Sequence, residues 1–324
     1  MRSKIWCNLP FSETQLAAKR YLKQAVSEYE TAFYDDGDSG RQGVAREKLI
    51  AADIAFGAPD VSAVTESKTL RFVQLFSAGY AAFDEPEVRN DFIQKGRVLA
   101  NSSPIFNEPC SEHLAAMILA VARQLPQALA EQNSKRRWRQ AEFRSGAQIL
   151  AGQRVVIFGF GAIGARLAEI LAALKMQVVG VRRHPKGNEA VRTVPVEQGD
   201  AELAAADHII NVLPGGDQTH MFFSAERFAR AKEGAVYYSI GRGSTTDQKA
   251  LRSALQTKKL SAAFSDVTEP EPLAPEDPLW TTPNCYITPH IASGSAHERF
   301  DQIDLFLSNL KRFEAGEDLE GRIF

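Results

Sequence analysis

The sequence predicts a protein of the α/β class, built from two parallel-sheet domains. Three observations support this fold class. The chain has 324 residues, which is too long for one small core and fits two domains. Strand-like and helix-like segments alternate along the chain, as they do where helices join parallel strands. The segment from residue 154 to 183 shows the complete pattern of strand, glycine turn, helix and strand.

Composition and charge exclude several classes of protein. The chain has 44% apolar and 24% charged residues, as ordinary globular proteins do, and its formal net charge is −2. That charge provides no electrostatic basis for binding nucleic acid or an anionic membrane, and no apolar run is long enough to span a bilayer. The cysteines, Cys7, Cys110 and Cys285, are far apart and follow neither a disulfide nor a zinc pattern. We therefore expect a cytoplasmic protein without a metal, a nucleic-acid partner or a membrane anchor.

The N-terminal part of the chain predicts a small parallel-sheet domain, although its apolar periodicity is weak. Ser12 is a candidate cap for a helix that runs through Leu22 and Val26. The turn Ser77-Ala78-Gly79-Tyr80 follows a strand, and such a turn can direct backbone N–H groups toward an anion. The strands expected here are 4–7, 31–34, 54–57 and 72–76.

A crossing point between the two domains is expected at Asn101-Ser102-Ser103-Pro104. A helix follows from His113 to Leu125, with an apolar stripe that includes Met117 and Ile118. Such a stripe is typical of packing, so we interpret His113 as a structural histidine. The basic cluster at 135–139 is interpreted as a solvated surface.

The most specific signal is the unit that begins with the β-branched run 155–158, which predicts a buried strand. Glycines follow with the spacing GxGxxG, then a helix with one apolar face and a second strand at 178–181. Gly159 permits a tight turn, Gly161 lets a pyrophosphate approach the backbone, and Gly164 lets the helix pack on the strand. The pattern predicts a Rossmann-type dinucleotide site at Gly159, Gly161, Ala162, Ile163 and Gly164.

The residue that follows the second strand indicates which dinucleotide binds. Many NAD-binding folds have an acidic residue there, which accepts hydrogen bonds from the ribose 2′-OH. This chain has Arg182, followed by Arg183. A guanidinium binds a 2′-phosphate bidentately, whereas a carboxylate repels it. The alternative is that both arginines simply point into solvent. We expect NADP(H) as the preferred cofactor and NAD(H) as the second choice.

The alternation of strands and helices continues to the C-terminus. The proline-rich segment 268–278 is expected to be a loop, because proline cannot donate a hydrogen bond in a strand ladder. The expected strands are 208–213, 235–240, 262–267 and 285–288, and the expected helices are 246–256 and 297–313.

Three charged or titratable residues come just after expected strand ends: Arg242, Glu271 and His290. In open α/β sheets, ligands bind beyond the carboxyl ends of the strands. Each residue alone has an ordinary explanation as a helix cap or a solvated surface group. Together they supply what carbonyl reduction needs, namely a fixed cation for the substrate, a proton donor, and a carboxylate that tunes the donor.

These segments resemble the D-isomer-specific 2-hydroxyacid dehydrogenases over nearly the whole chain past residue 70. The Arg, Glu and His motifs in this order are highly specific for that family. The matching segments are GFGAIG at 159–164, NVLPGGDQTH at 211–220, SIGRGSTTDQKAL at 239–251, DVTEPEPL at 266–273, PLWTTPNCYITPHIAS at 278–293 and NLKRFEAGEDLEG at 309–321.

By motif position, the resemblance implies that Arg242 binds the substrate, that His290 is the acid/base, and that Glu271 is its acidic partner. It implies that Ala78 and Gly79 lie in the loop whose N–H groups hold the substrate carboxylate. The further residues implied to contact the cofactor are Leu213, Pro214, Ile240 and Asp266, the last near the nicotinamide amide, together with His290.

The resemblance also implies a domain arrangement. A discontinuous substrate domain would contain residues 1–100 and 291–324, and a dinucleotide-binding domain would contain residues 101–290. The active site would occupy a cleft between these two Rossmann-like or flavodoxin-like domains. Family members are usually homodimers, so we expect a homodimer.

The sequence departs from the family pattern at two segments. The usual VGVGxDxxD reads FSAGYAAFDEP at 76–86, in the loop that faces the substrate, and the usual VAEH reads CSEHLAAM at 110–117. Glu271 stands where the formate dehydrogenase branch has a glutamine. Arg182 and Arg183 resemble the NADP(H)-preferring glyoxylate/hydroxypyruvate reductase branch.

The sequence therefore predicts an oxidoreductase that reduces a small 2-oxoacid to a D-2-hydroxyacid with NAD(P)H. A second hypothesis stays open, since some relatives of this fold use a dinucleotide to control protein–protein contacts. That hypothesis is a dinucleotide-sensing, corepressor-type binding protein with little turnover.

Overall fold

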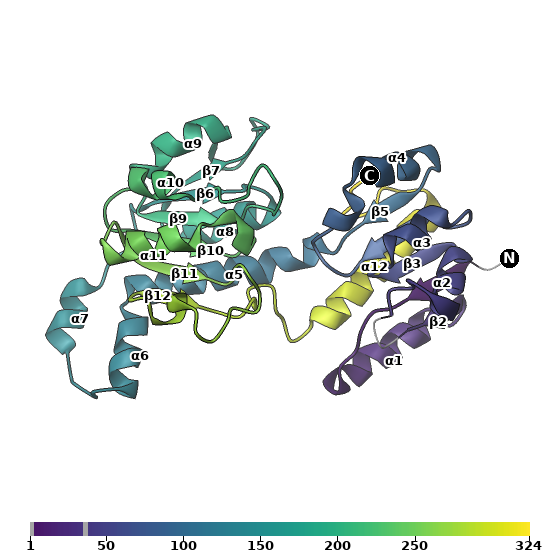
Figure 1. The fold of residues 1–324 in the computed structure, drawn as a ribbon, viewed down its shortest axis with the longest axis horizontal. Coiled ribbons are helices and arrows are strands. Elements are labelled where there is room, and N and C mark those ends of the chain that lie inside the picture. Colours follow the sequence, from purple (N-terminus) through teal and green to yellow (C-terminus); the bar gives the residue numbers. More distant parts are fainter. Residues whose placement is uncertain (1–2, 35–37) are drawn as a thin grey trace. The chain divides into compact units, whose positions relative to one another are not determined.

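The protein is described here by a computed structural model that covers residues 3–34 and 38–324. The chain divides into two compact units (Figure 1), which are Met1–Phe106 with Ser295–Phe324, and Asn107–Gly294. We call them unit 1 and unit 2. The expected domain boundaries, after residues 100 and 290, lie a few residues before these. In the described part of each unit the strands form a parallel sheet between helices, which confirms the predicted α/β fold class.

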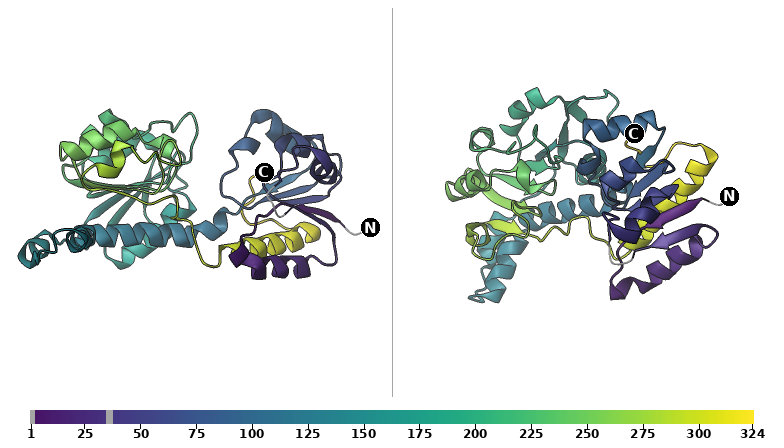
Figure 2. Two further views of the ribbon diagram at one scale, coloured as in Figure 1. Left: turned by 60° about the horizontal axis from the view of Figure 1, so that its bottom comes forward. Right: turned by 45° about the vertical axis from the view of Figure 1, so that its right-hand side comes forward.

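Unit 1 contains these strands in its described residues: β1 (Lys4–Cys7), β2 (Glu30–Phe33), β3 (Ile54–Gly57), β4 (Phe72–Leu75) and β5 (Val98–Ala100). Its helices are α1 (Leu16–Ala25), α2 (Gly43–Ile50), α3 (Val61–Glu66), α4 (Pro86–Gln94) and α12 (Glu298–Ala315). The sheet order is β2-β1-β3-β4-β5. α1 and α12 cover one face, and α2, α3 and α4 cover the other (Figure 2). Because both faces are covered, every side chain of β3 and β4 is buried.

Unit 2 contains the strands β6 (Arg154–Phe158), β7 (Gln177–Val181), β8 (Arg192–Val194), β9 (His208–Asn211), β10 (Ala235–Ser239), β11 (Leu260–Ser265) and β12 (Cys285–Ile287). Its helices are α5 (Ser103–Ala122, which begins in unit 1), α6 (Leu125–Asn133), α7 (Gln140–Gly146), α8 (Ala162–Ala173), α9 (Val196–Leu203), α10 (Ala225–Arg230) and α11 (Gln248–Gln256). The sheet order is β12-β11-β10-β9-β6-β7-β8. α5 and α8 pack on one face of the sheet, and α9, α10 and α11 pack on the other.

The expected strands are present, with ends that differ by one or two residues. The helix expected from residue 113 begins ten residues earlier, at Ser103. The segment 101–104, expected to cross between the domains as a linker, therefore contains the first turn of α5. Asn101 Oδ1 accepts hydrogen bonds from the Ser103 N–H (3.2 Å) and hydroxyl (2.7 Å), as a capping side chain does. Pro104 is tolerated beside this start, where backbone N–H groups need no helical partner.

No helix in the described part of the chain is both long and apolar enough to cross a membrane.

A buried histidine lies at the start of β9. His208 Nε2 is 2.6 Å from Gln153 Oε1, and its Nδ1 is 3.1 Å from the Tyr238 hydroxyl. An amide oxygen can only accept, so Nε2 carries the proton and Nδ1 accepts from the hydroxyl. Burial lowers the pKa of His208 to about 4, and the nearby Asp207 opposes this effect. His208 is therefore a neutral part of the core.

His208 should make the fold sensitive to acid. An unfolded chain binds a proton on histidine with a pKa of about 6.5, whereas folding lowers the pKa of His208 to about 4. Because the folded value is lowered, the stabilisation is complete above about pH 6.5 and is lost as the pH falls toward 4. We expect His208 to account for about 3 kcal/mol of unfolding free energy across this window.

The measurement is urea unfolding of the parent, of His208→Gln and of His220→Gln between pH 4 and 7. His208→Gln should make the unfolding free energy depend less on pH. His220→Gln, at an exposed position, should leave that dependence as it is in the parent. Equal acid slopes for the parent and His208→Gln would contradict the assignment.

Candidate active site

The candidate site lies at the carboxyl-terminal edge of the unit 2 sheet. The glycine loop follows β6, Arg242 follows β10, Asp266 follows β11 and His290 follows β12. The strands are parallel, so these loops all leave the sheet at the same edge. The sheet thereby gathers residues that are distant in the sequence.

The glycine loop has the geometry that its spacing predicts. Gly159 has φ +88°, and a β-carbon there would lie 2.6 Å from Val212 O, so only glycine fits. A β-carbon on Gly161 would meet only Gly159 O, at 3.8 Å, which leaves that side of the loop open. The first N–H groups of α8, from Ala162 onward, have no intrahelical acceptor and are suited to bind an anion. The loop therefore fits a pyrophosphate.

Gly164 has the packing role expected of it. A β-carbon on Gly164 would lie 3.1 Å from a ring carbon of Phe160 and 3.2 Å from a methyl group of Ile157. The Ser111 hydroxyl donates to Asn107 O (2.6 Å) and also lies 3.1 Å from Ile163 O, so α5 contacts the same turn. Helix and strand are thus held close where the loop turns.

The loops after β9 and β10 are held by Asn211, a buried side chain that the sequence reasoning did not identify. Its Nδ2 donates to the hydroxyls of Tyr237 and Thr245, both at 2.8 Å. Its Oδ1 accepts from the Leu213 N–H (3.1 Å), and its backbone O accepts from the Ile240 N–H (3.1 Å). Asn211 therefore fixes the loops that carry two of the expected cofactor residues. The available signal was an asparagine between the apolar pairs 209–210 and 212–213.

Arg182 lies where the sequence places it, directly after β7, and its side chain is partly buried. Its Nη1 is 3.5 Å from Glu189 Oε1. The Glu189 carboxylate also accepts from the N–H groups of Lys186 (2.7 Å) and Gly187 (2.8 Å). These backbone bonds, that of Lys186 first, lower the pKa of Glu189. Arg183 is exposed and, among residues 3–34 and 38–324, has no ion-pair partner. The sequence reasoning did not identify Glu189 beside Arg182.

His290 and Glu271 form a hydrogen-bonded pair. His290 Nδ1 is 2.8 Å from Glu271 Oε2, and Glu271 Oε1 accepts from the Thr268 N–H at 3.0 Å. A carboxylate can only accept, so Nδ1 carries a proton and Nε2 is left for a reacting group. The side chains are 46% and 38% exposed, respectively, so the imidazole is open to a ligand.

Arg242 supplies a positive charge on the loop that follows β10. Its side chain is exposed, its Nη1 donates to Gly241 O (2.7 Å), and no carboxylate pairs with it in the described part of the chain. A β-carbon on Gly243 would lie 1.9 Å from Thr268 O, so the loops after β10 and β11 are packed backbone against backbone. Because Thr268 also binds Glu271, this packing fixes Arg242 relative to the carboxylate. An uncompensated guanidinium suits an anionic substrate.

Asp266 is buried beneath the His290 loop. Its Oδ1 accepts from the Thr288 hydroxyl (2.5 Å) and the Ile291 N–H (2.9 Å), and its Oδ2 accepts from the Ala292 N–H (2.9 Å). All three donors lie in the segment that contains His290. The carboxylate is therefore engaged within the protein itself.

A pocket of about 380 Å³ adjoins the pair on unit 2. Glu271 and His290 line it, and its other walls are mainly apolar, including Leu273, Trp280 and Ile287. The Trp280 indole donates to Ala274 O (2.9 Å), which fixes the ring in the wall. There is thus space for a small organic group beside His290.

Ala78 and Gly79 lie on unit 1, in the loop after β4. Ala78 O accepts from Asn101 Nδ2 (2.7 Å), and Gly79 O accepts from the Ser77 hydroxyl (2.8 Å). Within the residues that the structure describes, neither amide N–H has an acceptor. With its carbonyls bound and its N–H groups free, the loop is suited to hold an anion.

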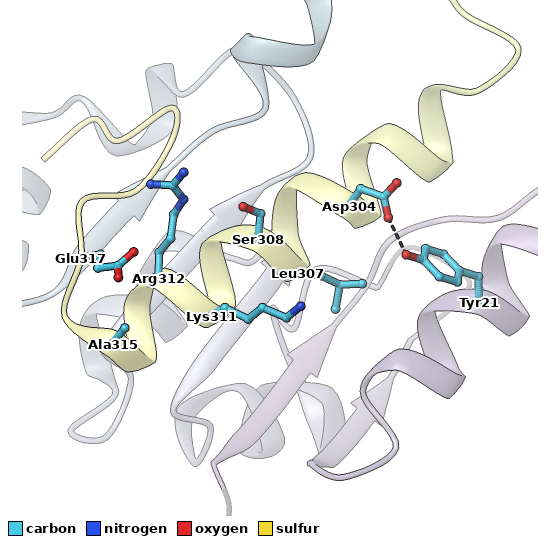
Figure 3. A pocket seen from close by; sticks show the side chains of 8 residues that line it. All are labelled: Tyr21, Asp304, Leu307, Ser308, Lys311, Arg312, Ala315 and Glu317. Carbon is cyan, nitrogen blue, oxygen red and sulfur yellow. Dashed lines mark hydrogen bonds between the residues drawn. The ribbon is translucent and has the colours of Figure 1, made fainter.

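A larger groove of about 510 Å³ also lies on unit 1, beside α1 and α12 (Figure 3). The Tyr21 hydroxyl donates to Asp304 at 2.6 Å there, and Lys311 and Glu317 are among the lining residues. The groove contains none of the predicted site residues, so its size does not make it the reaction site.

Comparisons with known proteins show which family the chain resembles. The family model described as D-isomer specific 2-hydroxyacid dehydrogenase, NAD binding domain, matches residues 115–292. Glyoxylate/hydroxypyruvate reductase B of Escherichia fergusonii is 32% identical over 249 residues, which are 74% of each chain.

Two solved structures are similar over the whole chain. A D-isomer specific 2-hydroxyacid dehydrogenase family protein from Aeromonas salmonicida has a TM-score of 0.78 and 29% identity, and covers 100% of this chain and 99% of that one. A D-isomer specific 2-hydroxyacid dehydrogenase from Xanthobacter autotrophicus Py2, solved with NADPH and MES, has a TM-score of 0.82 and 25% identity, and covers 100% and 98%.

Proposed function

Because the chain belongs to the D-isomer specific 2-hydroxyacid dehydrogenase family, we propose that it reduces a small 2-oxoacid to the D-2-hydroxyacid, with NADPH as the preferred hydride donor. The observation that carries this proposal is the exposed His290–Glu271 pair, with the uncompensated Arg242 on a loop that packs against Thr268. Glyoxylate or hydroxypyruvate is the proposed substrate class, since the Escherichia fergusonii relative is named for both. The proposed setting is the cytoplasm, because the cysteine spacing shows no disulfide pattern.

Arg242 would bind the substrate carboxylate and polarise the ketone, stabilising the negative charge that develops on its oxygen. The free N–H groups of Ala78 and Gly79 support a role in carboxylate binding as well. Bound NADPH supplies the hydride to C2.

His290 would donate the proton that the reduced oxygen needs. Its Nδ1–H is held by Glu271, so a protonated imidazole presents Nε2–H to the substrate oxygen, and the neutral imidazole accepts a proton in the reverse direction. The Thr268 N–H fixes the other oxygen of Glu271 and so keeps the carboxylate directed at the imidazole. The pair can therefore serve both reaction directions.

The nucleotide side of unit 2 fits NADP(H). The open backbone at Gly161 and the first N–H groups of α8 would hold the pyrophosphate. Arg182 and Arg183 would bind the 2′-phosphate, and Arg182 would exchange part of its contact with Glu189 for it. The remaining proposed cofactor contacts are Leu213, Pro214, Ile240 and Asp266.

The homodimer expected from the family also belongs to this proposal. α6 and α7, with the loop between them, form an arm of unit 2 that exposes Leu125, Leu129 and Trp138, the last by 91%. Glu131 pairs with Arg137 and Arg139 and keeps this arm ordered. A second copy of the chain would cover these side chains.

Sedimentation should therefore give a dimer for the parent and a monomer for Leu129→Glu, and a monomeric parent would contradict the arrangement.

Cofactor preference is tested at Arg182. The parent should have a higher kcat/KM with NADPH than with NADH, and Arg182→Asp should shift the preference toward NADH. The lost phosphate contact should cost about 1.5–3 kcal/mol. Arg230→Asp, on α10, is the matched charge control and should leave the preference unchanged. Equal kcat/KM for both cofactors in the parent would end this part of the proposal.

The proton donor is tested with NADPH and a panel of 2-oxoacids. His290→Gln can form a hydrogen bond but cannot deliver a proton, so turnover should fall by about 10²–10⁴. Glu271→Gln removes the charge that favours the imidazolium, so the reductive kcat/KM profile should move to lower pH. His297→Gln, an exposed histidine, is the control. An unmoved profile in Glu271→Gln would remove Glu271 from the mechanism, and a parent without turnover would favour the dinucleotide-sensing hypothesis.

A further inference from the structure

We infer that Asp266 is a positioning residue for His290, acting as a clamp on the segment 288–292. The inference rests on the proposed role of His290 as the proton donor and goes beyond the nicotinamide contact that motif position implies. Its basis is that the Asp266 side chain is directed at the loop of the histidine, with 1% of its surface exposed.

The clamp contacts the loop on both sides of His290. Thr288 donates its hydroxyl to Asp266, and Ile291 and Ala292 donate their N–H groups. The His290 N–H itself lies 2.8 Å from Asp266 O and 3.0 Å from Thr288 O. The backbone and the carboxylate of Asp266 thus bind every residue of the segment 288–292 except Pro289.

The loop needs such support because of its own conformation. His290 has φ +53°, in the left-handed region that a side chain disfavours. It follows β12, an edge strand, and its side chain is exposed, so packing around the imidazole does not hold the backbone. The buried Asp266 carboxylate accepts three hydrogen bonds from this loop and thereby keeps His290 Nδ1 aligned with Glu271.

A histidine supports the clamp from α5. His113 Nε2 is 3.5 Å from the Thr288 hydroxyl and 4.0 Å from Asp266 Oδ1. Burial lowers the pKa of His113, and the charge of Asp266 opposes this effect. Thr288 gives its hydrogen to Asp266 and can accept one from His113. The hydrogen bonds that connect His113 on α5 with Asp266 therefore pass through the Thr288 hydroxyl.

The test compares Asp266→Asn with Glu271→Gln. If Asp266 positions His290, Asp266→Asn should lower kcat by about 10²-fold, as a small misplacement of a reacting group does. The reductive pH profile should move to lower pH, as in Glu271→Gln, and the double variant should show no further shift. The Kd of NADPH, from fluorescence titration, is measured alongside, because Asp266 is also a proposed cofactor contact. Thr288→Val leaves that carboxylate in place and should keep the Kd within about twofold of the parent.

Thr288 provides a matched pair of smaller changes. Thr288→Ser keeps the hydroxyl and should retain the parent profile, whereas Thr288→Val removes it with little change in shape and should shift the profile in the same direction as Asp266→Asn. These variants test the clamp if Asp266→Asn does not fold.

A readout without turnover separates this inference from the proposed function. In the cofactor-free protein, nitrogen NMR follows the imidazole of His290 against pH, and hydrogen exchange follows the amides of Ile291 and Ala292. The clamp predicts a lower titration midpoint and faster exchange in Asp266→Asn and Thr288→Val, even if no 2-oxoacid is reduced. An unmoved midpoint and unchanged exchange in both variants would overturn the clamp and leave Asp266 with its proposed cofactor contact alone.

Discussion

Parallel strand direction is the constraint on which the candidate site depends. With every strand of the unit 2 sheet running the same way, all the loops that carry functional residues leave at one edge. Helices pack on both faces of this sheet, so the side chains of its central strands are largely buried and mostly apolar. The groups proposed for the reaction therefore lie in the loops that leave the sheet rather than within its strands.

Buried polar side chains then hold those loops in place. Asn211 ties the loops after β9 and β10, and Asp266 ties the loop after β12. The backbone approach at Gly243 joins the loops after β10 and β11. Each contact joins segments that are distant in the chain. A buried polar group without a partner costs free energy, so these contacts allow few alternative loop arrangements.

Charge in the site is divided between paired and unpaired groups. Glu271 is held by both His290 and Thr268, whereas Arg242 has no carboxylate partner in the described part of the chain. Arg182 is intermediate, with a long contact to Glu189. This division places the unpaired cation where an anionic substrate is expected. A 2′-phosphate bound at Arg182, as proposed, would compete with the Glu189 carboxylate, an effect that the arginine residues alone do not indicate.

The sequence by itself determined the fold class, the strands other than β5 and β8, the glycine turn and the order of Arg242, Glu271 and His290. These features depend on local periodicity, on the conformation of glycine and on the position of each residue relative to a strand end. Only the tertiary structure decided which groups contact one another: Glu189 with Arg182, Asn211 with the two loops, and Asp266 with the segment around His290. It also decided that α5 begins at Ser103, through the cap from Asn101. The physical reason is that Asn211 and Asp266 meet their partners through the folding of distant segments, while the two local contacts depend on the exact conformation of the chain. Hydrogen-bond geometry is set by that approach rather than by spacing in the chain.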